Sequence, residues 1–423
     1  MNWFSAISEG FTMALGSLLR NKLRSMLSVL GITIGIYCII AVYALVHSLE
    51  KNLNDSFSNY GTDVLFVQKW PWDEIGGEYP WWKYNNRPQA TAEESQFISE
   101  NINKDLVSAV AFTFSTRALV ERKEISLSNV QLMAISFEYN AIQKVDVELG
   151  RYFTHAEMNS GRPVVIIGAN VAENLFQGQY AVGKNIKIKG KNCVVIGVCR
   201  KEGKTVLGNS ADEQVFLPAR LAMGMMNYKR GEKGCQIMIK AKPKVSLDLL
   251  KFEVAQMMRR YRRLSLSADD NFAVNTMSMI TNVISNLFGQ IRTIGFVIGG
   301  FSMLVGCFGV ANIMFVSVKE RTQEIGIQKA LGAHNYFILI QFLIESVFLC
   351  LIGGIIGLIL VWFTLSAMNY GLQHYLESAI RLYLANSDIS IGIIVSVIVG
   401  IIAGFIPALG ASRLNPVDAI RSK

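Results

Sequence analysis

Residues that could bind phosphate or carry out catalysis are few in this sequence. The stretch "EGKT", Glu202–Thr205, ends like a phosphate-binding loop, in which consecutive backbone N–H groups surround the phosphates. That loop needs four residues between its two glycines, whereas five residues separate Gly197 from Gly203. We therefore reject a nucleotide site in this chain.

The histidines and cysteines form no catalytic or metal-binding pattern either. The four histidines have no second ligand at helical or hairpin spacing, and no Ser-His-Asp or Cys-His arrangement can be argued from spacing. Cys193, Cys199 and Cys235 fall in one predicted domain, and this odd number gives no complete disulfide framework. We expect three buried free thiols, no catalytic residues, and no metal or cofactor bound by this chain.

One charged segment stands between two of the most apolar stretches of the chain. The segment "KERTQEIGIQKALGA", Lys319–Ala333, carries its charges at Lys319, Glu320, Arg321, Glu324 and Lys329. Each charge would cost about 2.5–3.5 kcal/mol at the centre of a bilayer, so the segment must lie outside the hydrocarbon. The apolar residues before Gly332 predict a short amphipathic helix, with a face made of Ile325, Ile327, Ala330 and Leu331. Such a helix, joined to two membrane helices, suits pushing against a partner.

Four blocks are apolar enough to cross a membrane, which takes about 20 residues in a helix. They are Ser25–His47, Gly289–Val318, Phe337–Met368 and Ile389–Ala411. The first is too long for the apolar region of a signal peptide and lacks a cleavage site, so we expect an uncleaved anchor. The second and third exceed the length needed, which predicts tilt or extension beyond the bilayer. The third and fourth should form a hairpin.

Ionisable residues are absent from the predicted centre of these spans. An ion-driven carrier would keep such residues near the midplane to bind its coupling ion. Arg292 lies near the outer end of the second span, and Glu345 lies about two turns into the third. We expect Glu345 to pair with a basic neighbour at the level of the lipid headgroups. The pattern disfavours an ion-driven carrier.

Basic residues are distributed unevenly around the spans. Four crossings place nine of them on one side: Arg20, Lys22, Arg24, Lys319, Arg321, Lys329, Arg413, Arg421 and Lys423. The short loop on the other side, Asn369–Asp388, carries only Arg381. The positive-inside rule therefore places the N-terminus, the middle segment and the C-terminus in the cytoplasm. Residues 1–24 share an apolar face that predicts a helix on the membrane surface, the alternative being the cytoplasmic end of the first span.

The long segment between the first and second spans predicts one α+β extracytoplasmic domain. This domain could consist of two lobes. Short β-branched runs such as "DVLFVQ", "RPVVIIG", "KNIKIKGKNCVVIGVC", "EQVFLP" and "CQIMIKAK" predict strands. Helical signals interleave with them. Thr91 and Glu94 have the spacing of a capping box, and the run that starts at Ser246 ends in four arginines, whose charge suits a helix C-terminus.

Two further patterns indicate packing or contact. Three spans contain glycines one turn apart, which let helices pack closely in a bundle or a dimer. These are Gly31 and Gly35, Gly353 and Gly357, and Gly400 and Gly404. The loop "WPWDEIGGEYPWWKY" holds Trp70, Trp72, Trp81 and Trp82. Such a loop favours contact with a partner or the bilayer, or else a hairpin held together by its own aromatic rings.

The order of these features resembles that of the MacB/FtsX-type permeases of ABC transporters. "ERTQEIGIQKALGA", "FLIESV" and "GGIIGLIL" resemble the family's signature, and "LNPVDAIR" resembles its C-terminal tail. The N-terminal "ALGSLLRNKLRSMLSVLGITIGI" and the domain segments "VVIIGANVAENLF" and "RRYRRLSLSADDNF" resemble the family as well. The similarity covers nearly the whole chain. The Trp-rich loop is not part of the general pattern.

The resemblance implies a permease subunit that couples ATP hydrolysis to movements of its extracytoplasmic domain, called mechanotransmission, and so drives efflux or export from the envelope. The alternatives are an FtsX-like regulator of an envelope enzyme and a lipoprotein-releasing permease. It implies a bacterial inner-membrane protein that forms a dimer, homo- or heteromeric, and binds membrane lipids but no nucleic acid. Because the chain starts at the surface helix, ATP and magnesium belong on a separate ATPase subunit. A periplasmic adaptor and an outer-membrane channel are further expected partners.

The resemblance also assigns residues. Lys319–Ala333 becomes the segment that docks on the ATPase, with Arg321, Glu324, Ile325 and Gly326 as its best-matching members. The expected order of segments is 1–24 interfacial helix, 25–47 first span, 48–288 extracytoplasmic core domain, 289–318 second span, 319–336 coupling segment, 337–368 third span, 369–388 outer loop, 389–411 fourth span and 412–423 cytoplasmic tail.

Overall fold

The computed structural model describes residues 22–58, 61–73, 80–203, 210–225, 234–375 and 380–421. Residues 1–21 of the predicted surface helix lie outside the described residues. The centre of the Trp-rich loop, residues 74–79, also lies outside them. The chain divides into two compact units. One comprises Met1–Lys51, Leu287–Leu376 and Arg381–Lys423 and is called here the helical unit. The other comprises Asn52–Asn286 and Glu377–Ile380 and is called the sheet domain.

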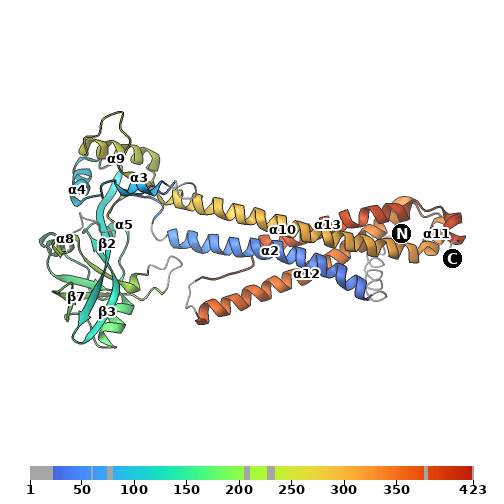
Figure 1. Ribbon diagram of the computed structural model, residues 1–423, viewed down its shortest axis with the longest axis horizontal. Helices are drawn as coiled ribbons and strands as arrows, with labels where there is room; N and C mark the ends of the chain where they lie inside the picture. Colours follow the sequence, from blue (N-terminus) through green and yellow to red (C-terminus); the bar gives the residue numbers. More distant parts are fainter. Residues whose placement is uncertain are drawn as a thin grey trace. The chain divides into compact units, whose positions relative to one another are not determined.

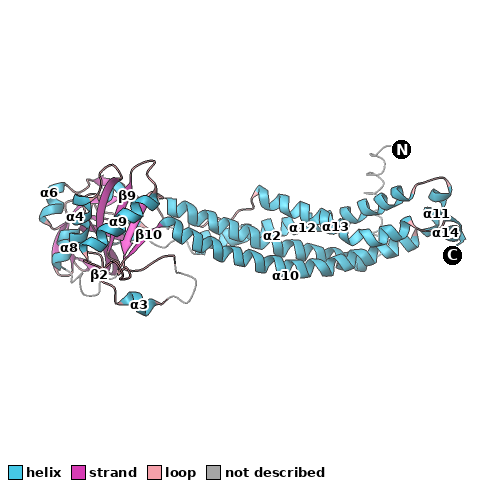
Figure 2. Cartoon of the chain, turned by 90° about the horizontal axis from the view of Figure 1, so that it is seen from above, coloured by secondary structure: helices cyan, strands magenta, loops and turns pink. Residues whose placement is uncertain are grey.

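The helical unit is built around four long helices. They are α2 (Lys22–Ser58), α10 (Met277–Glu320), α12 (Asn335–Tyr375) and α13 (Asn386–Ser412). The last residues of α2, from Asn52, and the first of α10, up to Asn286, belong to the sheet domain. Each contains a stretch long and apolar enough to cross a membrane, and the helices extend past the predicted spans at several ends. Helix α13 packs along α12, as the predicted hairpin requires, and the four helices run side by side (Figures 1 and 2). Two short helices, α11 (Thr322–Ala330) and α14 (Pro416–Arg421), complete the unit.

All six predicted packing glycines lie against another helix of the same chain. A Cβ atom on Gly31 would lie 3.2 Å from the Cα of Gly306 on α10, and one on Gly35 would lie 3.0 Å from the backbone of Met303. Gly353 and Gly357 on α12 approach α2, and Gly400 and Gly404 on α13 approach α12. These close approaches are the packing that small residues permit. The glycines therefore serve packing within the chain in this structure.

Gly400→Val is expected to destabilise the helical unit by about 1–3 kcal/mol because it overpacks a close helix contact. A Cβ on Gly400 would lie 2.6 Å from the Cα of Val347, where only backbone could yield. The matched control is Gly410→Val on the same helix, where no atom lies within 4 Å of the new Cβ. Thermal unfolding of the purified chain in detergent measures the difference. Equal melting temperatures for the two variants would contradict the packing role.

The sheet domain contains a mixed sheet of ten strands in its described residues. The strands are β1 (Val64–Gln68), β2 (Val107–Arg122), β3 (Ile125–Ile135), β4 (Val147–Gly150), β5 (Val164–Ile167), β6 (Asn185–Ile188), β7 (Lys191–Cys199), β8 (Gln214–Pro218), β9 (Gln236–Ala241) and β10 (Ala273–Thr276). Their order is β10-β1-β9-β2-β3-β8-β5-β7-β4, with β6 paired to β2 and β7. The β3–β8 and β5–β7 pairs are parallel, and the other pairs are antiparallel. The sheet thus mixes parallel and antiparallel strands, as an α+β domain can.

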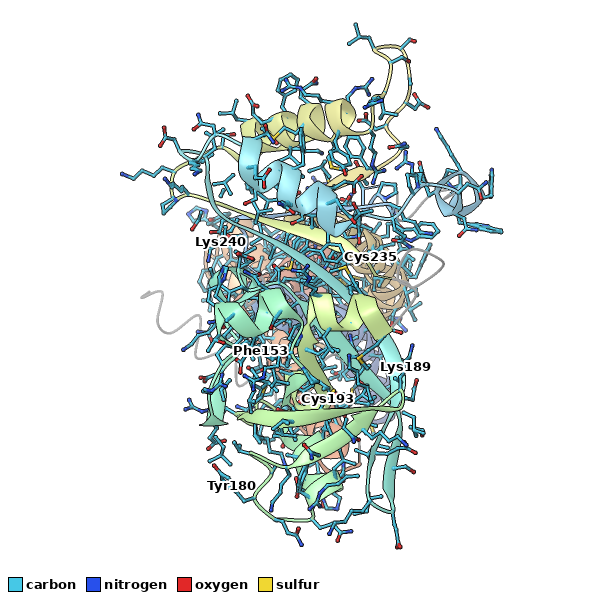
Figure 3. All side chains as sticks on the ribbon, turned by 90° about the vertical axis from the view of Figure 1, so that its left-hand side faces the viewer. Phe153, Tyr180, Lys189, Cys193, Cys235 and Lys240 are labelled. Carbon is cyan, nitrogen blue, oxygen red and sulfur yellow. The ribbon has the colours of Figure 1, made fainter. Side chains whose placement is uncertain are left out.

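Both faces of this sheet are covered. Its helices are α3 (Trp81–Asn85), α4 (Ala92–Asn101), α5 (Tyr139–Ile142), α6 (His155–Ser160), α7 (Ala169–Phe176), α8 (Ala219–Met225) and α9 (Leu247–Tyr261), with the 3-10 turn η1 (Ala211–Glu213). On β1, Leu65 and Val67 join the larger apolar cluster, whereas Val64 and Phe66 join the smaller one. Successive side chains of a strand point to opposite faces, so each face carries its own core. Figure 3 shows the domain with its side chains.

Local sequence signals explain several of these elements. Thr91 caps α4 as predicted: its hydroxyl accepts from the Glu94 amide, and the Glu94 carboxylate accepts from the Thr91 amide at 2.9 Å. Helix α9 begins after Ser246 and carries Arg259 and Arg260 in its last turn. The three cysteines of the domain are buried thiols, as expected.

A second capping box makes α6 sensitive to acid. The Arg151 guanidinium donates to both Glu157 oxygens at 2.7 and 2.8 Å, and the Thr154 amide donates at 2.9 Å. The arginine hydrogen bond is the main reason that the pKa of Glu157 falls from 4.5 to about 2. Because the folded-state pKa is the lower one, this stabilisation is present above pH 4.5 and is lost as the pH falls towards 2.

Glu157→Gln is therefore expected to destabilise the sheet domain at neutral pH by an amount that shrinks between about pH 5 and pH 2. Urea unfolding of wild type and variant across this range measures the difference. The exposed Glu148→Gln, which lies outside the capping box, is the control. A gap between wild type and Glu157→Gln that does not change with pH would contradict the role of the ionised carboxylate.

Candidate functional site at helix α11

Helix α11 is a separate helix because the chain turns at both of its ends. Helix α10 ends at Glu320, and the Thr322 hydroxyl donates to the carbonyls of Val318 and Lys319 at 3.0 and 2.9 Å, which satisfies the end of α10. At the other end, Gly332 has a φ of +95°. Glycine adopts this left-handed conformation without steric cost, so it ends α11 as the sequence predicts.

An ion pair joins the start of α11 to α12. Nη1 of Arg321 lies 3.5 Å from Oε2 of Glu345, whose side chain is 1% exposed. The Ser317 hydroxyl, at the end of α10, donates to Oε1 of the same carboxylate at 3.5 Å. The predicted pairing of Glu345 with a basic neighbour is confirmed. Glu345 therefore links α10, the start of α11 and α12.

A lysine joins the end of α11 to α13. Nζ of Lys329 donates to the carbonyls of Ser412 and Leu414, both at 2.7 Å. These carbonyls belong to the C-terminal end of α13 and the residues just after it, where a helix has unsatisfied acceptors and a partial negative charge. Lys329 thus caps a helix within the chain.

The middle of α11 packs on α14. A Cβ on Gly326 would lie 2.9 Å from the Cβ of Ala419 and 3.2 Å from the amide nitrogen of Ile420. Ile325 is buried at 3% exposure. The small size of Gly326 therefore lets the two short helices approach closely, and α11 has contacts with α12, α13 and α14.

The opposite side of α11 is exposed. Lys319, Glu320 and Glu324 are exposed, and Ile327 and Leu331, one turn apart, are 52% and 84% exposed. The predicted single apolar face is wrong in this respect, because Ile325 is buried while Ile327, Ala330 and Leu331 are exposed. We call Glu324, Ile327 and Leu331 the exposed α11 face. It combines a carboxylate with two large apolar side chains outside the predicted spans.

Comparisons with known proteins place these features in a family. Residues 25–257 match the MacB-like periplasmic core domain, and residues 296–416 match the FtsX-like permease C-terminal domain. The chain is 31% identical to the uncharacterized ABC transporter permease YknZ of Bacillus subtilis, over 98% of this chain and 99% of that protein. The chain is an ABC transporter permease of the MacB/FtsX type.

Other relatives are longer or more distant. The macrolide export ATP-binding/permease protein MacB of Rhodopirellula baltica is 28% identical over 98% of this chain and 62% of that protein. The chain therefore spans about three fifths of the length of such relatives. A crystal structure of the periplasmic region of MacB from Actinobacillus actinomycetemcomitans has a TM-score of 0.43 and 14% identity, covering 54% of this chain and 95% of that one.

The four tryptophans of the Trp-rich loop lie in two environments. The ring of Trp72 packs against Phe66 at 5.1 Å between centroids, and Asn275 bonds to the backbone of Trp70 and Trp72 at 2.8 and 3.0 Å. Trp81 and Trp82 lie on α3, and each is 60% exposed. The structure thus brings Trp70 and Trp72 onto the sheet domain and leaves Trp81 and Trp82 as the candidates for contact.

At this site, sequence reasoning missed one helix and one pair of acceptors. Helix α14 could have been found, because Asn415 followed by Pro416 is a typical helix start, and the Asn415 side chain accepts from the Val417 amide. The carbonyl partners of Lys329 carry no sequence signal, since every residue has a carbonyl.

In the described residues, no group of three or more His, Cys, Asp or Glu could hold a metal ion.

Proposed function

We propose that this permease couples ATP hydrolysis by an ATPase subunit to movements of its extracytoplasmic domain, and so drives efflux or export from the cell envelope. The observation that carries the proposal is the construction of α11. Its buried side is joined to α12, α13 and α14, while Glu324, Ile327 and Leu331 face outward. A force applied to the exposed α11 face would reach three helices of the helical unit at once.

The proposal distinguishes two roles among the predicted docking residues. Arg321, Gly326 and Lys329 hold α11 in place through contacts within the chain. Glu324, Ile327 and Leu331 contact the ATPase. We place this face, together with both termini, in the cytoplasm, which the distribution of basic residues supports. The ATP and magnesium belong to the ATPase, and this chain contributes no catalytic residue.

Replacing Ile327 and Leu331 together by aspartate is expected to lower recovery of the ATPase with the purified permease about tenfold or more, because buried anchors dominate interfaces. Affinity purification of the tagged permease, with quantification of any co-purified ATPase, measures this. The control is Leu266→Asp, which makes the same change at a fully exposed leucine of the sheet domain.

Two outcomes would count against this function. The first is recovery of no ATPase with the wild-type permease at adequate yield. The second concerns orientation: a cysteine placed at Glu324 should react with a membrane-impermeant reagent only after cells are opened. If the cysteine is labelled from outside intact cells, α11 does not lie on the cytoplasmic side, where ATP is available, and the proposed docking is contradicted.

A further inference from the structure

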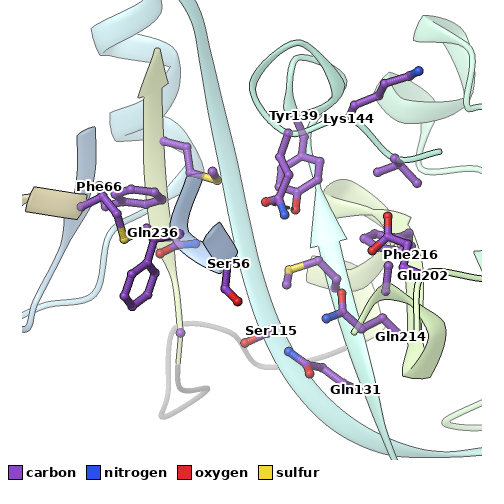
Figure 4. A pocket seen from close by; sticks show the side chains of 18 of the residues that line it. Ser56, Phe66, Ser115, Gln131, Tyr139, Lys144, Glu202, Gln214, Phe216 and Gln236 are labelled. Atoms are coloured by element: carbon purple, nitrogen blue, oxygen red, sulfur yellow. Dashed lines mark hydrogen bonds between the residues drawn. The ribbon is translucent and has the colours of Figure 1, made fainter. Parts of the chain in front are cut away.

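A cavity on one face of the sheet has a lining that the coupling proposal does not use. Its volume is about 440 Å³, within the range of roughly 300–1,000 Å³ that is usual for ligand pockets. Its floor comes from alternate residues of several strands, among them Phe66 on β1, Phe216 on β8 and Met238 on β9. These three belong to the smaller apolar cluster of the domain. The cavity therefore opens in that cluster (Figure 4).

Segments of two long helices line the same cavity. Ser56 and Phe57 come from α2, and Met277 and Ile280 come from α10. Each of these helices contains one of the first two candidate spans. A ligand in the cavity would touch the sheet and both helices together.

The apolar lining suits side chains of varied shape. Methionines Met133, Met238 and Met277 line it with the rings of Phe57, Phe66, Trp72, Tyr139 and Phe216. Methionine is unbranched and flexible, and surfaces rich in it accept different apolar partners. The cavity therefore selects for apolar character more than for one exact shape.

Glutamines supply the polar part of the lining. Gln131, Gln214 and Gln236 lie on β3, β8 and β9, and their side chains are drawn in Figure 4. Gln214 is only 7% exposed. Within the described residues, the side-chain amides of these three glutamines form no hydrogen bond with the protein. These amides border the open cavity, where water can satisfy them, so a ligand that displaces the water must offer hydrogen bonds of its own.

The charges at the cavity give no strong net preference. Lys144 lies 4.0 Å from Asp146 between the closest charged atoms, and Glu202 adds a second carboxylate to the lining. Arg200, which lies outside the lining, is 3.2 Å from Asp146. When the arginine that pairs with Asp146 from outside the lining is included, two carboxylates and two cations roughly cancel. The ligand is therefore recognised by neutral hydrogen bonding and apolar contact.

We propose that this cavity binds a short apolar peptide segment whose backbone hydrogen-bonds to Gln131, Gln214 and Gln236. A peptide backbone alternates N–H donors with carbonyl acceptors, and each glutamine amide offers both functions. Apolar side chains of the peptide fit among the methionines and aromatic rings. A lipid acyl chain would leave the amides unsatisfied, so it fits less well. The inference deepens the proposed function by naming a ligand class, and binding itself needs no ATPase.

The test uses the full-length permease in lipid nanodiscs without ATPase or nucleotide. The probe is a fluorescent panel of five-residue peptides made of alanine, leucine and phenylalanine, blocked at both ends, and binding is measured by fluorescence anisotropy. A matched panel with N-methylated backbones lacks the N–H donors, and fluorescent palmitate represents an acyl chain. We expect the unmodified panel to bind, and the other two probes to bind at least about tenfold more weakly, since a site built for hydrogen bonds rejects analogues that lack them.

Two variants locate the binding. Gln214→Leu removes the buried amide at nearly constant size and should weaken the peptide at least about tenfold. Gln131→Leu, at a half-buried position, serves the same purpose if the first variant does not fold. The control is Gln96→Leu at an exposed position of α4, which should leave binding unchanged. No peptide binding by the wild type, binding unaffected by both cavity variants, or equal binding of palmitate would each overturn the proposal. Peptide binding without ATPase recovery would reject the proposed function alone.

Discussion

Arg262→Met is expected to destabilise the sheet domain by about 3–5 kcal/mol, because it removes one partner of a buried ion pair. Arg262 donates to both oxygens of Glu94 at 2.7 and 3.2 Å, and the two side chains are 7% and 5% exposed. It also donates to Asn271 and to the carbonyl of Gln89. The variant leaves the Glu94 carboxylate buried without its cation.

The loss of stability should be larger because Glu94 makes a second interaction. The same carboxylate accepts from the Thr91 amide in the capping box of α4, so losing Arg262 also disturbs the start of that helix. The control is Arg260→Met, two residues away at an exposed position of α9, which should change stability by less than about 0.5 kcal/mol. Urea unfolding of the purified chain measures both. Similar losses for the two variants would show that the buried pair contributes no more than a surface charge.

The second large effect is expected at the junction of α10, α11 and α12. Arg321→Leu should destabilise the helical unit by about 3 kcal/mol, because the buried Glu345 carboxylate loses its cation. The double variant Arg321→Leu, Glu345→Leu should recover most of this loss, since replacing a whole buried pair by apolar side chains is often close to neutral. Thermal unfolding in detergent compares the two.

The double variant also separates folding from coupling. It should fold, yet it no longer has the charged link between α11 and α12, so ATP hydrolysis by the bound ATPase should respond less to the permease. If the double variant is less stable than Arg321→Leu, the ion pair is not the interaction that holds this junction. If ATP hydrolysis responds normally to the permease in a well-folded double variant, the contacts of Lys329 and Gly326 must connect α11 to the other helices instead.

The sequence predicted most strongly where one local signal decided the structure. The four apolar blocks, the hairpin of α12 and α13, the Thr91 capping box and the turn at Gly332 each follow from nearby residues. Strands β2 and β3 were not predicted, although they are the longest in the sheet. Their two-residue connection is Lys123 and Glu124, and Lys123 has a φ of 52°. A hairpin without Asn-Gly or Asp-Gly at its turn is hard to predict from the sequence, because these pairs are the strongest local hairpin signal.

The candidate site shows the same limit. The charged segment was recognisable, but the sequence could not tell which of its residues point inward. Arg321 and Lys329 look alike in sequence, yet one pairs with a carboxylate and the other caps carbonyls of α13. The cavity could not be predicted at all, because it gathers residues from β1, β3, β8, β9 and two long helices. Contacts that far apart in the chain are set by the tertiary fold.

The unbridged sulfurs of the sheet domain bear on where this protein can mature. Cys193, Cys199 and Cys235 are shielded from solvent, and burial raises the pKa of Cys199 to about 12. A thiol that stays protonated is a poor nucleophile and reacts slowly with oxidants. The domain can therefore reach its native state without help from thiol-oxidising catalysts, and reducing agents should leave its fold intact. Cells that lack a periplasmic oxidation system could assemble it as readily as cells that have one.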